Sequence, residues 1–212
     1  PGDIVVIASA DGVSGQAKIS VQPPVVAGLK IEPDQTEAYP GGKVKIALIA
    51  VADGDKPASY SEVKVSTPTA QVALRAEKTV LDANGRAALE LAMPETPGEV
   101  IVEASADEVK QQLRLLVKPR PVAKLEAQPQ VLDATVGSQV SFAIKALAEN
   151  DLPAGYNQLA VSTPSEGVVI DRQTLTVDGN GQANLKVTAP AKPGPAVVIV
   201  AAGERKIELQ LT

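Results

Sequence analysis

The chain has 212 residues and a formal net charge of −5; 44% of its residues are hydrophobic but only 2% are aromatic. It contains no cysteine and no histidine, which excludes disulfides, thiolate metal sites and any histidine-dependent catalytic triad. Charge is spread evenly, neither half of the chain is basic, and no apolar run is long enough to cross a bilayer. We therefore expect no nucleic-acid partner and no membrane insertion.

An internal repeat organises the sequence. Ser66-Thr67-Pro68 recurs as Ser162-Thr163-Pro164, which sets an offset of 96 residues. The stretch DANG at 82–85 recurs at the same offset as DGNG at 178–181, without a gap. A repeat of this length indicates tandem copies of one folding unit.

The same offset divides the chain into three segments. Pro1-Gly2 corresponds to Pro97-Gly98, so residues 1–24 are predicted to be the C-terminal strand pair of a preceding repeat, and we expect the natural protein to continue upstream with more of the same. Residues 25–120 form a complete repeat and residues 121–212 form a second one. The segments meet at proline-rich stretches, which are typical of short, extended linkers.

Each repeat has the alternating pattern of β-strands. Val44, Ile46, Leu48 and Ala50 fall on one face of a predicted strand. Turn signals recur about every ten residues, and no segment favours a helix of ten residues. About seven or eight short antiparallel strands per repeat predict an all-β chain of tandem immunoglobulin-like sandwiches.

Two turn motifs are predicted from local chemistry. Asn84 and Gly85 tolerate a positive φ, as a tight hairpin needs, and Asp82 can accept hydrogen bonds from backbone amides across the turn. Pro97-Gly98 is predicted to end one strand and to reverse the chain before the next.

These motifs carry a resemblance to a known family. The stretch "V.VSTP…TVLDANGRAALELAMPETPGEVIVEASAD", with the upstream "DGDKPAS", resembles bacterial immunoglobulin-like domains of the invasin and intimin type. The resemblance covers both repeats and the leading fragment, although "DGDKP" and "ENDLP" match the family's earlier Asp-X-X-Gly-X-Pro element loosely. It implies sandwiches in tandem array on bacterial surfaces, often holding a functional tip away from the cell.

Two acidic loops at equivalent positions are candidates for calcium ligands. Asp53 with Asp55, and Glu149 with Asp151, offer the carboxylate oxygens that calcium prefers. The alternative is a solvated turn that merely uses Asp and Asn, and it is favoured because neither loop is densely acidic. The linkers lack acidic residues, so no calcium is expected there. We predict no metal site, no cofactor and no catalytic residue.

The aromatic residues are interpreted mainly as structural. Tyr60 and Tyr156 recur at the repeat offset and are expected to lie on the sandwich rim rather than to form a binding platform. Phe142 replaces Ile46 in an inward-facing pattern and is predicted to be buried. Tyr39 lies in a turn, is expected to be exposed, and is the better candidate for a contact.

The repeated Ser-Thr-Pro motif has two interpretations. Its hydroxyl groups could be glycosylated or act as nucleophiles, or the motif could end a strand. Without a histidine or a suitably spaced lysine the nucleophile has no activating base, which favours the strand-ending interpretation.

The leading functional hypothesis is a structural spacer in a stalk, surface layer or fibre of a long extracellular bacterial protein. The alternatives are an adhesin module that binds a host or matrix receptor or a glycan directly, and an accessory region of a secreted enzyme; no enzymatic activity is predicted for this chain. The expected partners are neighbouring repeats. A lone hairpin is not stable in water. Either a longer chain was trimmed, or residues 1–24 pair with another copy of the chain.

Overall fold

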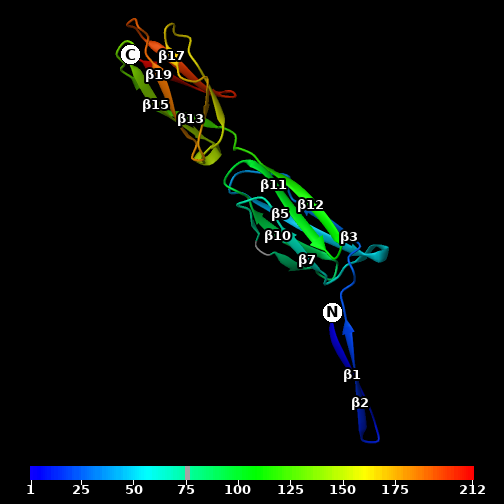
Figure 1. Ribbon diagram of the computed structural model, residues 1–212. Helices are drawn as coiled ribbons and strands as arrows, with labels where there is room; N and C mark the ends of the chain where they lie inside the picture. Colours follow the sequence, from blue (N-terminus) through cyan, green and yellow to red (C-terminus); the bar gives the residue numbers. More distant parts are fainter. Residues whose placement is uncertain (75–76) are drawn as a thin grey trace. The chain divides into compact units, whose positions relative to one another are not determined.

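The computed structural model describes residues 1–74 and 77–212, and its regular structure is almost entirely β (Figure 1). The chain divides into two compact units, which are described separately. Unit 1 comprises Pro1–Pro94 and Gly98–Val117, and unit 2 comprises Glu95–Pro97 and Lys118–Thr212. The predicted all-β class is confirmed.

Unit 1 contains an N-terminal hairpin and a sandwich. The hairpin strands β1 (Gly2–Ala10) and β2 (Val13–Val21) pair only with each other in the part of the chain that the structure describes. The sandwich strands are β3 (Gly28–Pro33), β4 (Glu37–Ala38), β5 (Lys43–Ala52), β6 (Lys56–Pro57), β7 (Glu62–Ser66), β8 (Ala73–Leu74), β9 (Lys78–Val80), β10 (Arg86–Ala92), β11 (Gly98–Ala106) and β12 (Val109–Val117). One sheet has the order β3-β5-β10-β8, with β6 beside β5, and the other has the order β4-β12-β11-β7-β9.

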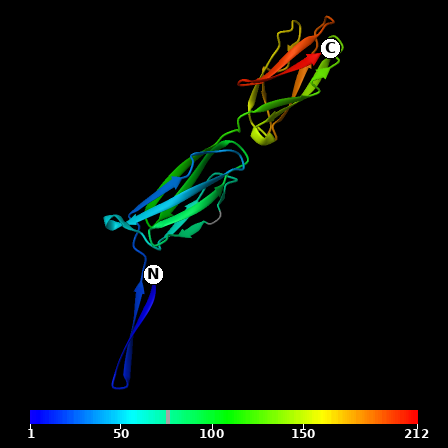
Figure 2. The same cartoon turned by 180° about the vertical axis from the view of Figure 1, so that it is seen from behind.

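Unit 2 repeats this arrangement. Its strands are β13 (Lys124–Gln128), β14 (Val131–Leu132), β15 (Gln139–Leu147), β16 (Gln158–Ser162), β17 (Val169–Ile170), β18 (Thr174–Thr176), β19 (Gln182–Thr188), β20 (Ala196–Ala202) and β21 (Arg205–Leu211). The two sheets have the orders β13-β15-β19-β17 and β14-β21-β20-β16-β18. Figure 2 shows the layers from behind.

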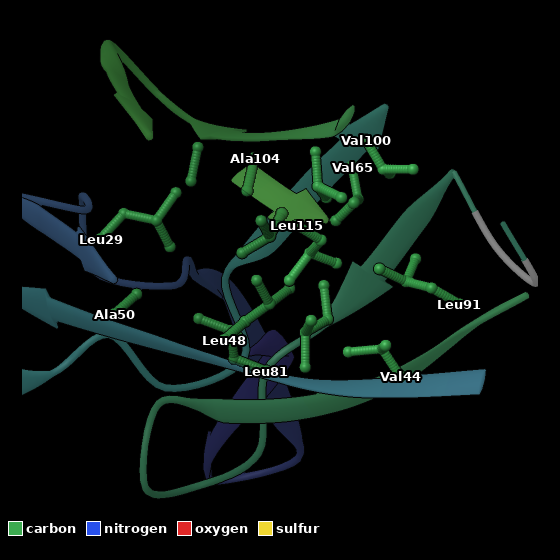
Figure 3. Close-up of a cluster of buried hydrophobic side chains, with 14 of the residues drawn as sticks. Leu29, Val44, Leu48, Ala50, Val65, Leu81, Leu91, Val100, Ala104 and Leu115 are labelled. Atoms are coloured by element: carbon green, nitrogen blue, oxygen red, sulfur yellow. The ribbon is translucent and has the colours of Figure 1, made fainter. Parts of the chain in front are cut away.

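Small aliphatic side chains fill the space between the two sheets of unit 1. Val44, Ile46, Leu48 and Ala50 of β5 are all buried, as their period of two predicts. Figure 3 shows side chains of both sheets converging in this cluster. Phe142 is fully buried in unit 2, so its predicted place in the core is confirmed.

The connections differ from the prediction in two respects. The Asp82–Gly85 turn does not close a hairpin, because β9 pairs with β7 in one sheet while β10 pairs with β5 in the other. The turn therefore carries the chain from one sheet to the other. In addition, β4 pairs with β12 and β14 pairs with β21 in parallel, so the sheets are not wholly antiparallel.

Helical structure in the described residues consists of two single 3₁₀ turns, η1 (Asp53–Asp55) and η2 (Glu149–Asp151). No helix among these residues is long and apolar enough to span a bilayer.

Candidate functional site

The acidic loops form the two 3₁₀ turns at equivalent positions. Gly54 and Asn150 occupy the same place in these turns, with φ of 70° and 56°. These residue types adopt a positive φ most readily, which accounts for the loop composition through backbone geometry. Among residues 1–74 and 77–212, no cluster of three or more acidic, histidine or cysteine side chains is placed to hold a metal ion.

In the Ser-Thr-Pro motif of unit 1, side-chain hydroxyl groups continue the hydrogen bonding between β7 and β11 past the end of β7. Pro68 has no N–H that could donate a hydrogen bond to β11. The Thr67 hydroxyl Oγ1 donates instead, to the Ile101 carbonyl at 2.8 Å. The Ile101 N–H donates to Thr69 Oγ1 at 2.9 Å. Hydroxyl groups thus satisfy both main-chain polar groups of one strand residue, which supports the strand-ending interpretation.

Unit 2 reproduces this bonding with a different residue pair. Thr163 Oγ1 donates to the Val197 carbonyl at 2.6 Å, and the Val197 N–H donates to Ser165 Oγ at 2.9 Å. Because the same bonds occur in both units, they serve the fold of each repeat and do not mark a site belonging to one of them.

The two repeated tyrosines lie on the rim, both with a positive φ of about 60°. Tyr156 is half-buried, and its hydroxyl lies so close to Gly179 that a Cβ there would be 2.8 Å away. Unit 1 has Ala83 at the position of Gly179, and Tyr60 is more exposed. Tyr39 is exposed, as expected.

A contact that the sequence did not predict fixes the linker at the start of each unit. In unit 1, Ser61 Oγ donates to the Pro24 carbonyl at 2.9 Å. In unit 2, Asn157 Nδ2 donates to the Arg120 carbonyl at 2.8 Å. The donors are 96 residues apart, and so are the acceptors. Each donor directly follows a repeated tyrosine, which is the sequence signal that could have revealed it.

A second linker contact is specific to unit 1. The Val26 N–H donates to Asp107 Oδ2 at 2.7 Å, at the turn between β11 and β12. The corresponding residue of unit 2 is Gly203, which has no side chain to accept such a bond. The first linker is therefore held at two points.

These contacts define where the chain enters and leaves the sandwich of unit 1. The chain enters beside Asp107, at the turn that precedes β12, and leaves at Val117, where β12 ends. A strand of nine residues spans roughly 26 Å at about 3.3 Å per residue. The polypeptide therefore passes from one end of the sandwich to the other.

The outer face of unit 2 carries a shallow groove of about 980 Å³. It is lined by side chains of β13, β15 and β19, among them Glu126, Lys145, Gln182 and Asn184. The Lys124 ammonium lies 2.5 Å from the Glu126 carboxylate, which lowers the pKa of Glu126 and raises that of Lys124. None of the lining residues is aromatic, so the groove offers no stacking surface of the kind that aromatic rings provide.

The fold is that of the immunoglobulin-like sandwiches found in bacterial adhesins. The adhesin InvE of Yersinia pseudotuberculosis superposes with a TM-score of 0.61 at 17% identity, over 87% of this chain and 58% of that one. Invasin, a bacterial integrin-binding protein, superposes with a TM-score of 0.56 at 19% identity, over 87% of this chain and 39% of that one. The chain thus spans little more than half the length of the first structure and less of the second.

A looser match is found with the surface layer protein SbsC, domains 4–9, with a TM-score of 0.39 at 14% identity. This superposition is too loose to carry an argument. No family model and no curated protein sequence matches the chain.

Proposed function

We propose that the chain is a structural spacer segment of an extracellular bacterial surface protein, in a stalk, surface layer or fibre. The observation that carries the proposal is the path of the polypeptide in unit 1, which enters beside Asp107 and leaves at Val117, at opposite ends of β12. A unit built this way adds its own length to a chain of repeats. The neighbouring repeats are then its main partners.

The parallel pairing near the end of β12 supports this role. Leu116 and Val117 pair with Glu37 and Ala38 of β4, close to the point where the chain leaves the unit. Because β4 belongs to the N-terminal part of the repeat and runs parallel to β12, tension between the ends loads these hydrogen bonds along the strands. Bonds loaded in this direction must break together, so the unit resists extension.

The extracellular location rests on the fold likeness to surface adhesins.

The groove of unit 2 favours one alternative, a module that binds a receptor or glycan directly. Titration of the intact chain against immobilised integrin ectodomains, matrix proteins and a glycan array separates the two roles. The spacer role predicts no saturable binding. Saturable binding that Lys145→Glu and Gln182→Ala both weaken at least tenfold would instead assign recognition to the groove.

A further inference from the structure

The hairpin β1–β2 exposes one face composed almost entirely of apolar side chains. The register pairs Ile4 with Ile19 and Val6 with Ala17, which places these residues on the same face, and Gly2 with Val21 extends it. Ile4, Val6, Ile19 and Val21 are between 44% and 53% exposed. An apolar sheet face left open in this way is a surface that a partner covers.

Unit 1 shows what such a partner looks like, because β11–β12 is the equivalent hairpin 96 residues later and is covered there. Its corresponding residues are Val100, Val102, Leu115 and Val117, and all four are no more than 2% exposed. They are covered by the facing sheet of unit 1, in the same cluster as Val44, Ile46, Leu48 and Leu91.

The other face of the hairpin is mixed, with polar and charged side chains beside the exposed Val5 and Ile7. Lys18 Nζ lies 2.6 Å from Asp3 Oδ2, and the corresponding pair, Arg114 Nη1 and Glu99 Oε1, lies 3.0 Å apart on the outer face of unit 1. Lys18 also lowers the pKa of Asp3. The equivalent ion pairs lie on the face opposite the apolar one in both hairpins, so the charged face of β1–β2 corresponds to the outer face of β11–β12.

The two outer edges of β1–β2 correspond to the edges of β11–β12 that are paired in unit 1. The outer edge of β11 pairs with β7, and the outer edge of β12 pairs with β4. Both edges of β1–β2 are open in the described residues. A partner that only added a strand at an edge would leave the apolar face uncovered, whereas the segment equivalent to residues 25–96 engages the face and both edges.

We propose that β1–β2 completes an immunoglobulin-like sandwich, and that its partner is a segment of the same repeat type as residues 25–96, joined directly to Pro1. The fit extends to single residues. Thr67 and Thr69 bond both main-chain polar groups of Ile101, and the residue of β1 at that place is Val5. The proposal concerns only this hairpin and does not depend on the spacer role.

The test extends the intact chain at its N-terminus with a copy of residues 25–96. The repeat offset makes the junction seamless, since Thr96 then precedes Pro1 as it precedes Pro97. Amide hydrogen exchange at Val5 should slow at least a hundredfold relative to the unextended chain, and an additional cooperative unfolding transition should appear. Unchanged exchange at Val5 would overturn the proposal.

Two variants of the extended chain separate docking from a nonspecific effect. Ile4→Asp with Ile19→Asp places charges on the apolar face and should abolish the added protection. Ile7→Asp is the matched control, because its counterpart Glu103 is a charged residue on the solvent face, and it should leave the protection intact. Equal loss in both variants would contradict the assignment of the faces.

The competing occupant is a second copy of the chain. Light scattering on the unextended chain should report a monomer at micromolar concentration. A dimer that Ile4→Asp with Ile19→Asp dissociates, and in which Val5 is already protected, would overturn the proposal in favour of pairing between copies.

Discussion

Asn157 donates its side-chain amide to the main-chain carbonyl of Arg120 at 2.8 Å, which fixes the linker at the start of unit 2. Ser61 makes the equivalent bond to Pro24 in unit 1 with a different functional group. The two residues share neither size nor chemistry beyond the ability to donate a hydrogen bond. This points to the bond itself as the common feature of the two linkers.

Removing this donor should loosen the linker and destabilise the unit. Ser61→Ala leaves the Pro24 carbonyl without its partner, and we expect the free energy of unfolding to fall by about 1 kcal/mol. NMR relaxation should show increased motion at residues 22–25. Ser66→Ala is the control, because the Ser66 side chain is exposed, and it should change neither quantity. Equal behaviour of the two variants would contradict the role of Ser61.

Gly85 is required by a close backbone approach as well as by its φ of 70°. A Cβ at this position would lie 2.5 Å from the Ala50 carbonyl oxygen, so Gly85→Ala should cost about 3 kcal/mol or more in denaturant unfolding. Gly54 has the same φ, but nothing lies within 4 Å of the added Cβ. Gly54→Ala should therefore cost only about 1 kcal/mol. Similar costs for the two variants would refute the close approach.

The hydroxyl groups of the Ser-Thr-Pro motif are predicted to act as substitutes for backbone hydrogen bonds. Thr67→Val keeps the shape of the side chain but leaves the Ile101 carbonyl unsatisfied, and it should lower the free energy of unfolding by about 1–3 kcal/mol. Thr79→Val in β9 serves as the control and should be nearly neutral. If Thr67→Val proved equally neutral, the ladder would not depend on this hydroxyl.

Stability should be almost independent of pH between about pH 5 and pH 9, because the chain has no histidine or cysteine. The Lys124–Glu126 pair is fully charged throughout this range, so its contribution to stability changes only outside it. The pKa of Glu126 is lowered, so its contribution exists above its ordinary pKa and is lost as the pH falls through the lowered value. The pKa of Lys124 is raised, so its contribution is lost as the pH rises through the raised value.

Thermal unfolding of the chain across this pH range measures the effect. A flat profile is expected, and Lys124→Gln with Glu126→Gln should leave it flat. A stability transition with a midpoint near pH 6–7 would contradict the prediction.

The sequence predicted the features that depend on single strands. The alternation along residues 43–50 identified the buried face of β5, and the replacement of Ile46 by Phe142 correctly placed an aromatic ring in the core. Both follow from the fixed period of a strand, which assigns each side chain to one of two faces.

Features that depend on which strands pair were not predictable in this way. The Asp82 carboxylate accepts bonds from the amides of Asn84 and Arg86, as expected, yet the turn joins two sheets rather than two strands of a hairpin. The same hydrogen bonds within the turn form whether the next strand pairs with the previous one or joins the other sheet. The turn residues therefore do not predict which sheet the next strand enters. The repeated tyrosine marks the positions of Ser61 and Asn157 in the sequence, but their acceptors are main-chain carbonyls, which no residue type identifies.

Pulling a single molecule from Pro1 and Thr212 tests the spacer role most directly. We expect two separate unfolding events, one for each sandwich, each releasing roughly 300 Å of chain at about 3.6 Å per extended residue. A single event of twice this length, or extension without a resisting force, would contradict a chain of independent load-bearing units.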